Sequence, residues 1–145
     1  MPVGMLLPVI ALALWTHVMW LWMYVTRIPA IRKAGMRLEP EVPRGEQMAQ
    51  LPARVRWKAD NYNHLMEQPT VFYAVAIVYS LLEVGGGWPL RFAWLYVGLR
   101  VVHSLVQAMW NKIEVRFVMF VLSSLVVIEM TVRALVLLLR IKGWT

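Results

Sequence analysis

Four apolar stretches, separated by short polar connections, dominate the sequence. They cover residues 5–25, 64–84, 90–110 and 115–139. Each is close to or above the ~20 residues that a helix needs to cross the hydrocarbon core of a bilayer. Hydrophobic residues make up 60% of the chain, which exceeds the roughly one half that soluble domains contain. The pattern predicts an all-α integral membrane protein, a bundle of four transmembrane helices in one domain over residues 1–145.

The positive charge of the chain is concentrated in the connection between the first two apolar stretches, at about residues 27–55. Eight of the fifteen Lys and Arg residues lie in or next to this connection: Arg27, Arg32, Lys33, Arg37, Arg44, Arg54, Arg56 and Lys58. Cytoplasmic loops of membrane proteins are enriched in Lys and Arg. We therefore expect the connection in the cytoplasm and both termini outside it. This placement also explains the net charge of +7, so no nucleic-acid partner is expected.

The chain contains no cysteine. Disulfide bonds, Cys-ligated metal sites and a thiol nucleophile on the protein itself are therefore excluded. No metal is expected, and any thiol chemistry has to come from a bound small molecule.

Polar residues recur at helical spacing in the second and third stretches. Pro52 predicts that the second helix begins near Ala53, because proline is favoured in the first turn of a helix. One face of that helix then carries a polar set, since residues three and four apart are neighbours: Arg56, Asp60, Asn63 and Glu67. The third stretch carries a second such set: Arg100, His103, Gln107 and Asn111.

The expected topology brings both sets to the cytoplasmic half of the membrane. Arg27 at the end of the first stretch and Arg116 at the start of the fourth join them there. Ionisable residues within a membrane usually face a cavity or a partner. The sequence therefore predicts a polar pocket rich in Arg, and a guanidinium matches carboxylates and phosphates. A structural pair between Arg100 and Glu67, with His103 as a packing residue, is the alternative interpretation.

Two further ionisable sites lie outside this pocket. Glu129 and Arg133 are four residues apart in the last stretch, on roughly the opposite face from Arg116. They are expected to form a structural ion pair between helices or subunits. His17 in the first stretch is expected to be packed or hydrogen-bonded.

Two segments of the chain resemble the MAPEG family, the membrane-associated proteins in eicosanoid and glutathione metabolism. These segments are "RWKADNYNHLMEQPTVFYA" and "GLRVVHS" followed by "NKIEVRFVMF", and the resemblance extends over nearly the whole chain. It implies a four-helix subunit, a homotrimer, and glutathione bound between subunits at the cytoplasmic side. The second substrate would be a small lipophilic molecule delivered by membrane lipid.

The resemblance also implies roles for individual residues. Asn63 and Glu67 match the family pattern in the second helix, preceded by Arg56 or Lys58. Arg100 and His103 match an Arg-x-x-His pattern in the third helix, and Arg116 matches the Arg of the fourth. A nearby Arg lowers the pKa of a thiol by favouring the thiolate, so Arg116 is the implied catalytic residue. Glutathione is the implied cofactor, contacted by Arg27, Arg56, Asn63, Glu67, Arg100, His103, Gln107 and Arg116.

The chain departs from the family pattern at several positions. Asn63 and Glu67 are one residue further apart than usual, and Glu67 is closer to Pro69. Gln107 and Phe120 occupy positions where glutathione-using members often have Tyr, and Phe117 follows Arg116. These departures indicate a divergent bacterial-type branch, which implies the bacterial inner membrane.

Several functions are consistent with this interpretation of the sequence. The first is a glutathione transferase or peroxidase acting on lipophilic electrophiles or lipid hydroperoxides. The second is a non-catalytic membrane protein that binds a lipid or a protein partner, which the missing hydroxyl groups favour. A b-type haem protein using His17 and His103 is a weaker alternative, and no haem is expected. A multidrug transporter is disfavoured because the first stretch contains no acidic residue.

Overall fold

The computed structural model describes residues 3–43 and 45–143. All regular secondary structure in these residues is helical. The elements are a 3-10 helix η1 (Val3–Met5), α1 (Leu6–Lys33), α2 (Glu46–Ala49), α3 (Ala53–Glu67), α4 (Pro69–Leu81), α5 (Trp88–Met109) and α6 (Ile113–Ile141).

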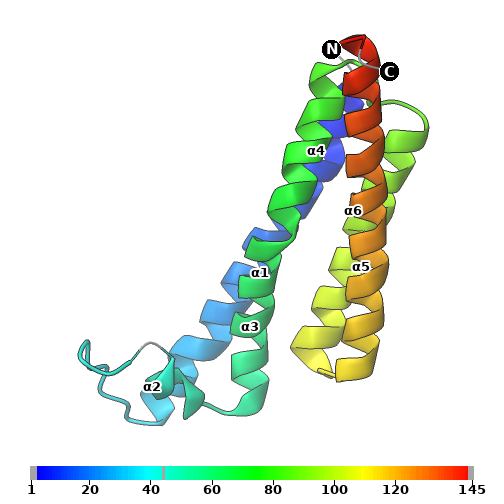
Figure 1. The fold of residues 1–145 in the computed structure, drawn as a ribbon. Coiled ribbons are helices and arrows are strands. Elements are labelled where there is room, and N and C mark those ends of the chain that lie inside the picture. The colour runs from blue at the N-terminus through cyan, green and yellow to red at the C-terminus, as the bar shows by residue number, and fades with distance from the viewer. Residues whose placement is uncertain (1–2, 44, 144–145) are drawn as a thin grey trace.

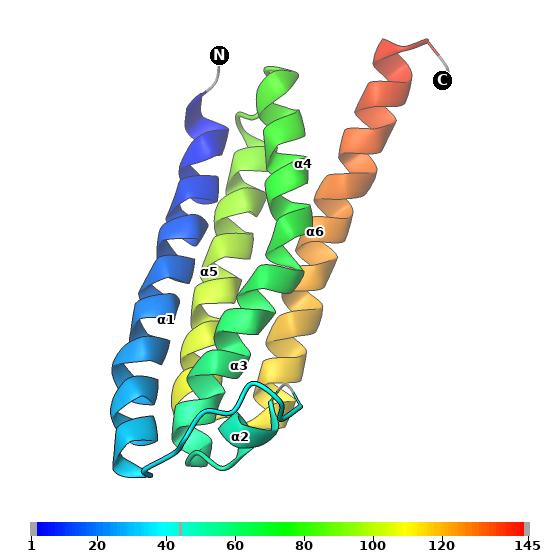
Figure 2. The same ribbon diagram turned by 90° about the vertical axis from the view of Figure 1, so that its left-hand side faces the viewer.

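The long helices form an antiparallel bundle (Figures 1 and 2). The start of α1 and the end of α6 lie at one end of this bundle, together with the α4–α5 connection. The short helix α2 and the α5–α6 turn lie at the opposite end. Helix α5 contacts α1, α3 and α6, and it contributes more buried residues than any other helix. Figure 2 shows the C-terminal half of α6 leaning away from the other helices.

Three helical segments are long and apolar enough to cross a membrane. They are Val3–Lys33, Trp88–Met109 and Ile113–Ile141. Helices α3 and α4 follow each other along the bundle, and each is shorter than the ~20 residues that a membrane span requires. Helix α3 begins at Ala53, as Pro52 predicts.

The predicted stretch at 64–84 is not one uninterrupted helix. It is divided at Gln68, between α3 and α4, and α4 ends at Leu81. Pro69 has no backbone N–H and so cannot donate to the carbonyl four residues earlier. Gln68 nevertheless keeps helical backbone angles, with φ −60° and ψ −37°. The division is therefore a gap in hydrogen bonding between two helices that follow each other closely (Figure 1).

The apolar core draws on every long helix. Leu12 and Met19 on α1, Phe72 on α4, Tyr96 on α5 and Met130 on α6 are all fully buried. The Phe72 and Tyr96 rings stack with their centroids 4.5 Å apart. Large apolar side chains on the outer faces of α1 and α6 are exposed. An apolar outer surface of this kind is suited to contact with lipid or with another subunit.

Helices α4 and α6 are joined by a hydrogen bond in which the Tyr79 hydroxyl donates to the Met130 carbonyl, at 3.0 Å. Replacing Tyr79 by Phe removes the donor from a buried position. We expect a loss of about 1 kcal/mol of stability, measured by thermal unfolding in detergent. Tyr24→Phe, at an exposed position of α1, is the control and should leave the midpoint unchanged. Equal midpoints for Tyr79→Phe and the wild type would contradict this expectation.

Candidate functional site

Helices α3 and α5 bury a cluster of polar side chains between them. Among the described residues, its members are all less than 3% exposed: Asn61, Arg100, His103, Ser104 and Gln107. Burying a polar group is costly unless it is hydrogen-bonded, and burying a charge is costlier. Each of these side chains nevertheless has at least one buried nitrogen or oxygen atom without a hydrogen-bond partner. We call this set the buried polar cluster.

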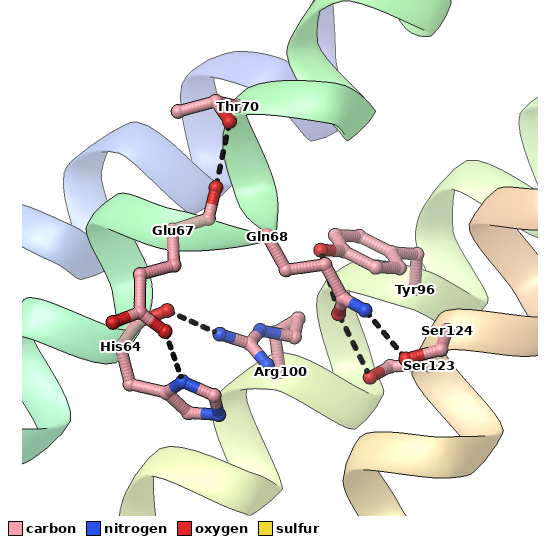
Figure 3. A network of polar contacts seen from close by, with 8 residues as sticks. All are labelled: His64, Glu67, Gln68, Thr70, Tyr96, Arg100, Ser123 and Ser124. Carbon is pink, nitrogen blue, oxygen red and sulfur yellow. Dashed lines mark hydrogen bonds and ion pairs between the residues drawn. The ribbon is translucent and has the colours of Figure 1, made fainter.

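Arg100 is the only charged residue among the buried residues that the structure describes, and its exposed fraction is 0%. Its Nη2 donates to the His64 carbonyl oxygen at 2.8 Å, in the last turn of α3 (Figure 3). The last carbonyls of a helix have no partner within it, and a cation there also meets the negative end of the helix dipole. Nε and Nη1 of Arg100 have no partner, so the guanidinium keeps unused donors.

The alternative pairing of Arg100 with Glu67 is not what the structure contains. Glu67 is 69% exposed, and its Oε2 lies 3.0 Å from Nδ1 of His64. Figure 3 shows one carboxylate oxygen of Glu67 joined to the His64 ring, while Arg100 reaches the backbone of the same residue. The predicted pair does not form because Glu67 lies on the outer face of α3, whereas Arg100 is buried inside the bundle.

The His64 ring packs against side chains of both α5 and α6. Its ring centroid is 4.9 Å from that of His103 on α5 and 5.3 Å from that of Phe120 on α6. Phe120 therefore packs beside the polar cluster without offering a hydroxyl group. Phe117, by contrast, is exposed.

Arg116 enters the same region from the start of α6. Its Nη1 donates to Oδ1 of Asn111 at 2.6 Å, and its Nε is buried without a partner. Asn111 has a φ of 54°, a left-handed conformation that Asn tolerates better than most residues. The turn thus places the Asn111 amide against Arg116. The positive charge of Arg116 is close enough to act on His64 and His103.

The α3–α4 division is held in place by Gln68. Its Nε2 donates to the Ser124 hydroxyl on α6. Its Oε1 accepts from Ser123 at 3.3 Å and from the Tyr96 hydroxyl at 3.4 Å. Figure 3 shows these contacts next to Arg100. Gln68 therefore fixes the end of α3, and with it the His64 carbonyl, relative to α5 and α6.

Arg27, Arg56 and Asn63 lie elsewhere, around a separate cavity of about 250 Å³. This cavity lies between the end of α1, helix α2 and the start of α3, and Asp60 also lines it. The eight residues predicted to contact glutathione therefore do not line one pocket within the subunit. Arg100, His103, Gln107 and Arg116 belong to the buried region, and Glu67 lies on the surface beside it.

Sequence reasoning missed three of the polar residues that α3 and its end contribute. Asn61, His64 and Gln68 are spaced by three and four residues, so they form a polar face of their own. This face is turned toward α5 and α6, whereas the predicted face with Arg56, Asn63 and Glu67 is largely exposed. The spacing of Asn61, His64 and Gln68 already indicates this inner polar face. The prediction was instead based on the charged residues of the outer face.

The remaining ionisable residues are separate from this region. Glu129 and Arg133 form an ion pair within α6 rather than between helices, and the Arg133 guanidinium lies 4.5 Å from the centre of the Trp88 ring. His103 has the ring of His64 beside it, and His17 hydrogen-bonds to its own helix. In the part of the chain that the structure describes, no three His, Asp or Glu side chains converge as a metal site would require.

The fold and this site define an all-helical membrane protein with cationic and polar groups buried in one half of its bundle. Sequence comparison identifies the family within this class of protein, because the profile of the MAPEG family matches residues 5–136. The chain belongs to the MAPEG family, and it is an integral membrane protein. Searches of curated proteins and of solved structures gave no match.

Proposed function

We propose that the protein binds glutathione and uses its thiol to modify lipophilic electrophiles or to reduce lipid hydroperoxides. One observation carries the proposal: Arg100 is fully buried, has two unpartnered nitrogen atoms, and has no carboxylate among its hydrogen-bond partners. A buried charge is normally paired. An anionic ligand would provide the missing partner, and membership of the MAPEG family makes glutathione the first candidate.

Glutathione matches the chemistry of the region. It carries two carboxylates and an ammonium group, and its thiol reacts as the thiolate. Arg100 would bind a carboxylate, with the unpartnered atoms of Asn61, His103 and Gln107 completing its hydrogen bonds. The exposed carboxylate of Glu67 would meet the ammonium group.

Arg116 is the proposed catalytic residue, because a guanidinium next to the sulfur lowers the pKa of the thiol. Its unpartnered Nε supports this role. In the transferase reaction the thiolate forms a carbon–sulfur bond with the electrophile, and the bond from that carbon to the leaving group breaks, so that the leaving group departs with the electron pair. In the peroxidase reaction it attacks the peroxide O–O bond, and the alcohol and a glutathione sulfenic acid are formed. A second glutathione then yields the disulfide and water.

We further propose that the protein is a homotrimer whose sites lie between subunits at the cytoplasmic side. Helices α3 and α4 would together form the second of four membrane spans, with both termini outside the cytoplasm. The separation of the predicted residues supports this assembly. Arg27, Arg56 and Asn63 line an open cavity, which a neighbouring subunit could bring to the buried polar cluster of the next chain.

Removing cationic side chains from the open cavity tests this assembly. We expect Arg27→Ala and Arg56→Ala each to weaken glutathione binding about threefold to tenfold, because each removes about 1 kcal/mol of partly solvated attraction. Arg37→Ala, in the exposed connection, should bind like the wild type. Calorimetry of the detergent-purified protein provides the affinities. Unchanged affinity in both cavity variants would remove this cavity from the glutathione site.

A non-catalytic lipid-binding protein is the second candidate, and one observation favours it. A cavity of about 470 Å³ between α1 and the α3–α4 region is lined mainly by apolar and aromatic side chains. Pockets of this size and character are typical of small-molecule sites. A lipid that remains bound through purification, and remains bound in Arg100→Ala, would support this function if glutathione binding is absent.

A further inference from the structure

His64 lies at the boundary between the buried polar cluster and the surface of the bundle. Its side chain is 21% exposed, whereas the neighbouring His103 is buried. Glu67, one turn further along α3, is largely exposed, and its Oε2 lies 3.0 Å from Nδ1 of His64. These two side chains therefore form a polar connection from the outer face of α3 to the cluster.

The contact with Glu67 determines which nitrogen of His64 is able to accept a proton. An ionised carboxylate only accepts hydrogen bonds, so Nδ1 of the neutral ring carries the hydrogen and donates it to Glu67. Nε2 is then the basic nitrogen, and it forms no hydrogen bond with any residue that the structure describes. Figure 3 shows this nitrogen on the side of the ring away from Glu67. A base that a third group orients in this way is typical of sites that remove a proton from a nucleophile.

Arg116 would place the glutathione sulfur beside the same ring. Arg116 and Phe120 are four residues apart on α6, so they share one face of that helix. The centroid of the Phe120 ring is 5.3 Å from that of His64, and the charge of Arg116 is close enough to act on His64. A thiol held by Arg116 would therefore lie near His64. Phe120 has no hydroxyl group with which to take the thiol proton itself.

The other groups around His64 are less suited to take this proton to water. The charged or titratable groups that face His64 are Glu67 on α3, Arg100 and His103 on α5, and Arg116 on α6. An arginine side chain stays protonated in proteins. His103 is 1% exposed, so a proton that it accepted would still have to pass His64 to leave the cluster.

We propose that His64 carries the proton of the glutathione thiol from the buried polar cluster to water, with Glu67 as its positioning residue. The inference rests on the proposed function and adds the route by which the thiolate forms. The S–H bond breaks, its electron pair stays on sulfur, and the proton binds Nε2 of His64. Nδ1 stays hydrogen-bonded to Glu67, whose negative charge stabilises the imidazolium. The Nε2 proton then passes to water at the exposed part of the ring, and the thiolate remains beside Arg116.

This route affects the rate at which the thiolate forms, rather than the amount that is present at equilibrium. The amount depends on the charges near the sulfur, and Arg116 is the group assigned to it. The rate depends on a base that reaches the thiol proton. A measurement of the rate at equal final amplitude therefore separates the role of His64 from that of Arg116.

The test mixes glutathione with the detergent-purified full chain and follows the ultraviolet absorbance of the thiolate by stopped flow. His64→Gln keeps a polar side chain next to Glu67 but has no basic nitrogen. We expect thiolate formation to become about 100-fold slower, the lower end of what a positioned acid–base group contributes, with affinity and final amplitude within about twofold. His17→Gln makes the same substitution at a histidine that hydrogen-bonds to its own helix, and it should react like the wild type.

Two further results distinguish a proton carrier from a packing residue. Imidazole buffer at constant pH and ionic strength should accelerate His64→Gln but not the wild type, because free imidazole replaces the missing base. Raising the pH should also bring the rate of the variant closer to that of the wild type, because hydroxide then takes the thiol proton directly.

Glu67→Gln provides a second variant at a largely exposed position. It keeps an acceptor for Nδ1 of His64 but removes the negative charge. At saturating glutathione, thiolate formation should be about twofold to fivefold slower, because an exposed partner of this kind contributes modestly. Thermal unfolding in detergent establishes that both variants are folded.

The outcomes separate this inference from the proposed function. Saturable glutathione binding with equal rates of thiolate formation in the wild type and His64→Gln would overturn the proton route alone. So would a slower His64→Gln variant that imidazole does not accelerate. Absence of saturable glutathione binding to the wild type would remove the proposed function, and the proton route with it.

Discussion

Replacing Arg100 by Met is expected to weaken glutathione binding about 10-fold to 100-fold. Hydrogen bonds to charged groups contribute roughly 1.5–3 kcal/mol, and Arg100 has two nitrogen atoms available for a ligand. Methionine retains much of the length and apolar volume of the side chain, so the substitution removes the charge with limited loss of packing. Calorimetric titration of the purified variant measures the change in affinity.

The same substitution also removes the donor to the His64 carbonyl. Thermal unfolding should therefore accompany the titration, because a partly unfolded variant would bind weakly for another reason. Arg100→Lys is the matched variant: it keeps the charge but loses the planar group that binds a carboxylate in two places. Its affinity should lie between those of the wild type and Arg100→Met. Wild-type affinity in a folded Arg100→Met protein would place glutathione outside the buried polar cluster.

Gln68→Leu is expected to lower stability by about 1–3 kcal/mol, the largest structural effect among our predictions. The substitution approximates the shape of the side chain but removes its contacts with Ser123, Ser124 and Tyr96. The two serine hydroxyls still donate to the Phe120 carbonyl, whereas the Tyr96 hydroxyl loses Gln68 as its acceptor. Leaving a buried donor or acceptor unsatisfied costs approximately this amount. The loss should appear as a lower thermal unfolding midpoint in detergent.

Two controls separate the role of Gln68 from a general effect of the substitution. Gln50→Leu changes the same residue type at an exposed position before α3, and its midpoint should equal that of the wild type. Ser124→Ala removes one of the three contacts of Gln68. Its unfolding midpoint should lie between those of the wild type and Gln68→Leu. An unchanged midpoint for Gln68→Leu would mean that these contacts contribute nothing to holding the α3–α4 division.

The sequence was sufficient to predict the helical membrane fold, because apolar length and positive charge are properties of single segments. The MAPEG resemblance was confirmed by the match to residues 5–136. The start of α3 at Ala53 followed from Pro52. The division at Gln68 was not predicted, although Pro69 provided the signal, because the apolar pattern continues across it.

The candidate site was predicted less completely, since a site depends on which helix faces meet. The polar face of the third stretch was identified, and Arg100, His103 and Gln107 are buried together. On α3 the charged outer face was predicted to line the site, whereas the inner face with Asn61 and His64 contacts α5. Helical spacing shows that two residues share a face. It does not show which of two polar faces of one helix is directed inward.

Titration of glutathione into the wild-type protein is the most direct measurement of the central claim, that the buried polar cluster is part of a glutathione site. We predict saturable binding in the micromolar to millimolar range, with proton release near neutral pH because the site favours the thiolate. The same titration with S-methylglutathione should show no proton release. A heat signal that never saturates would contradict the account and leave Arg100 as a structural cap of α3.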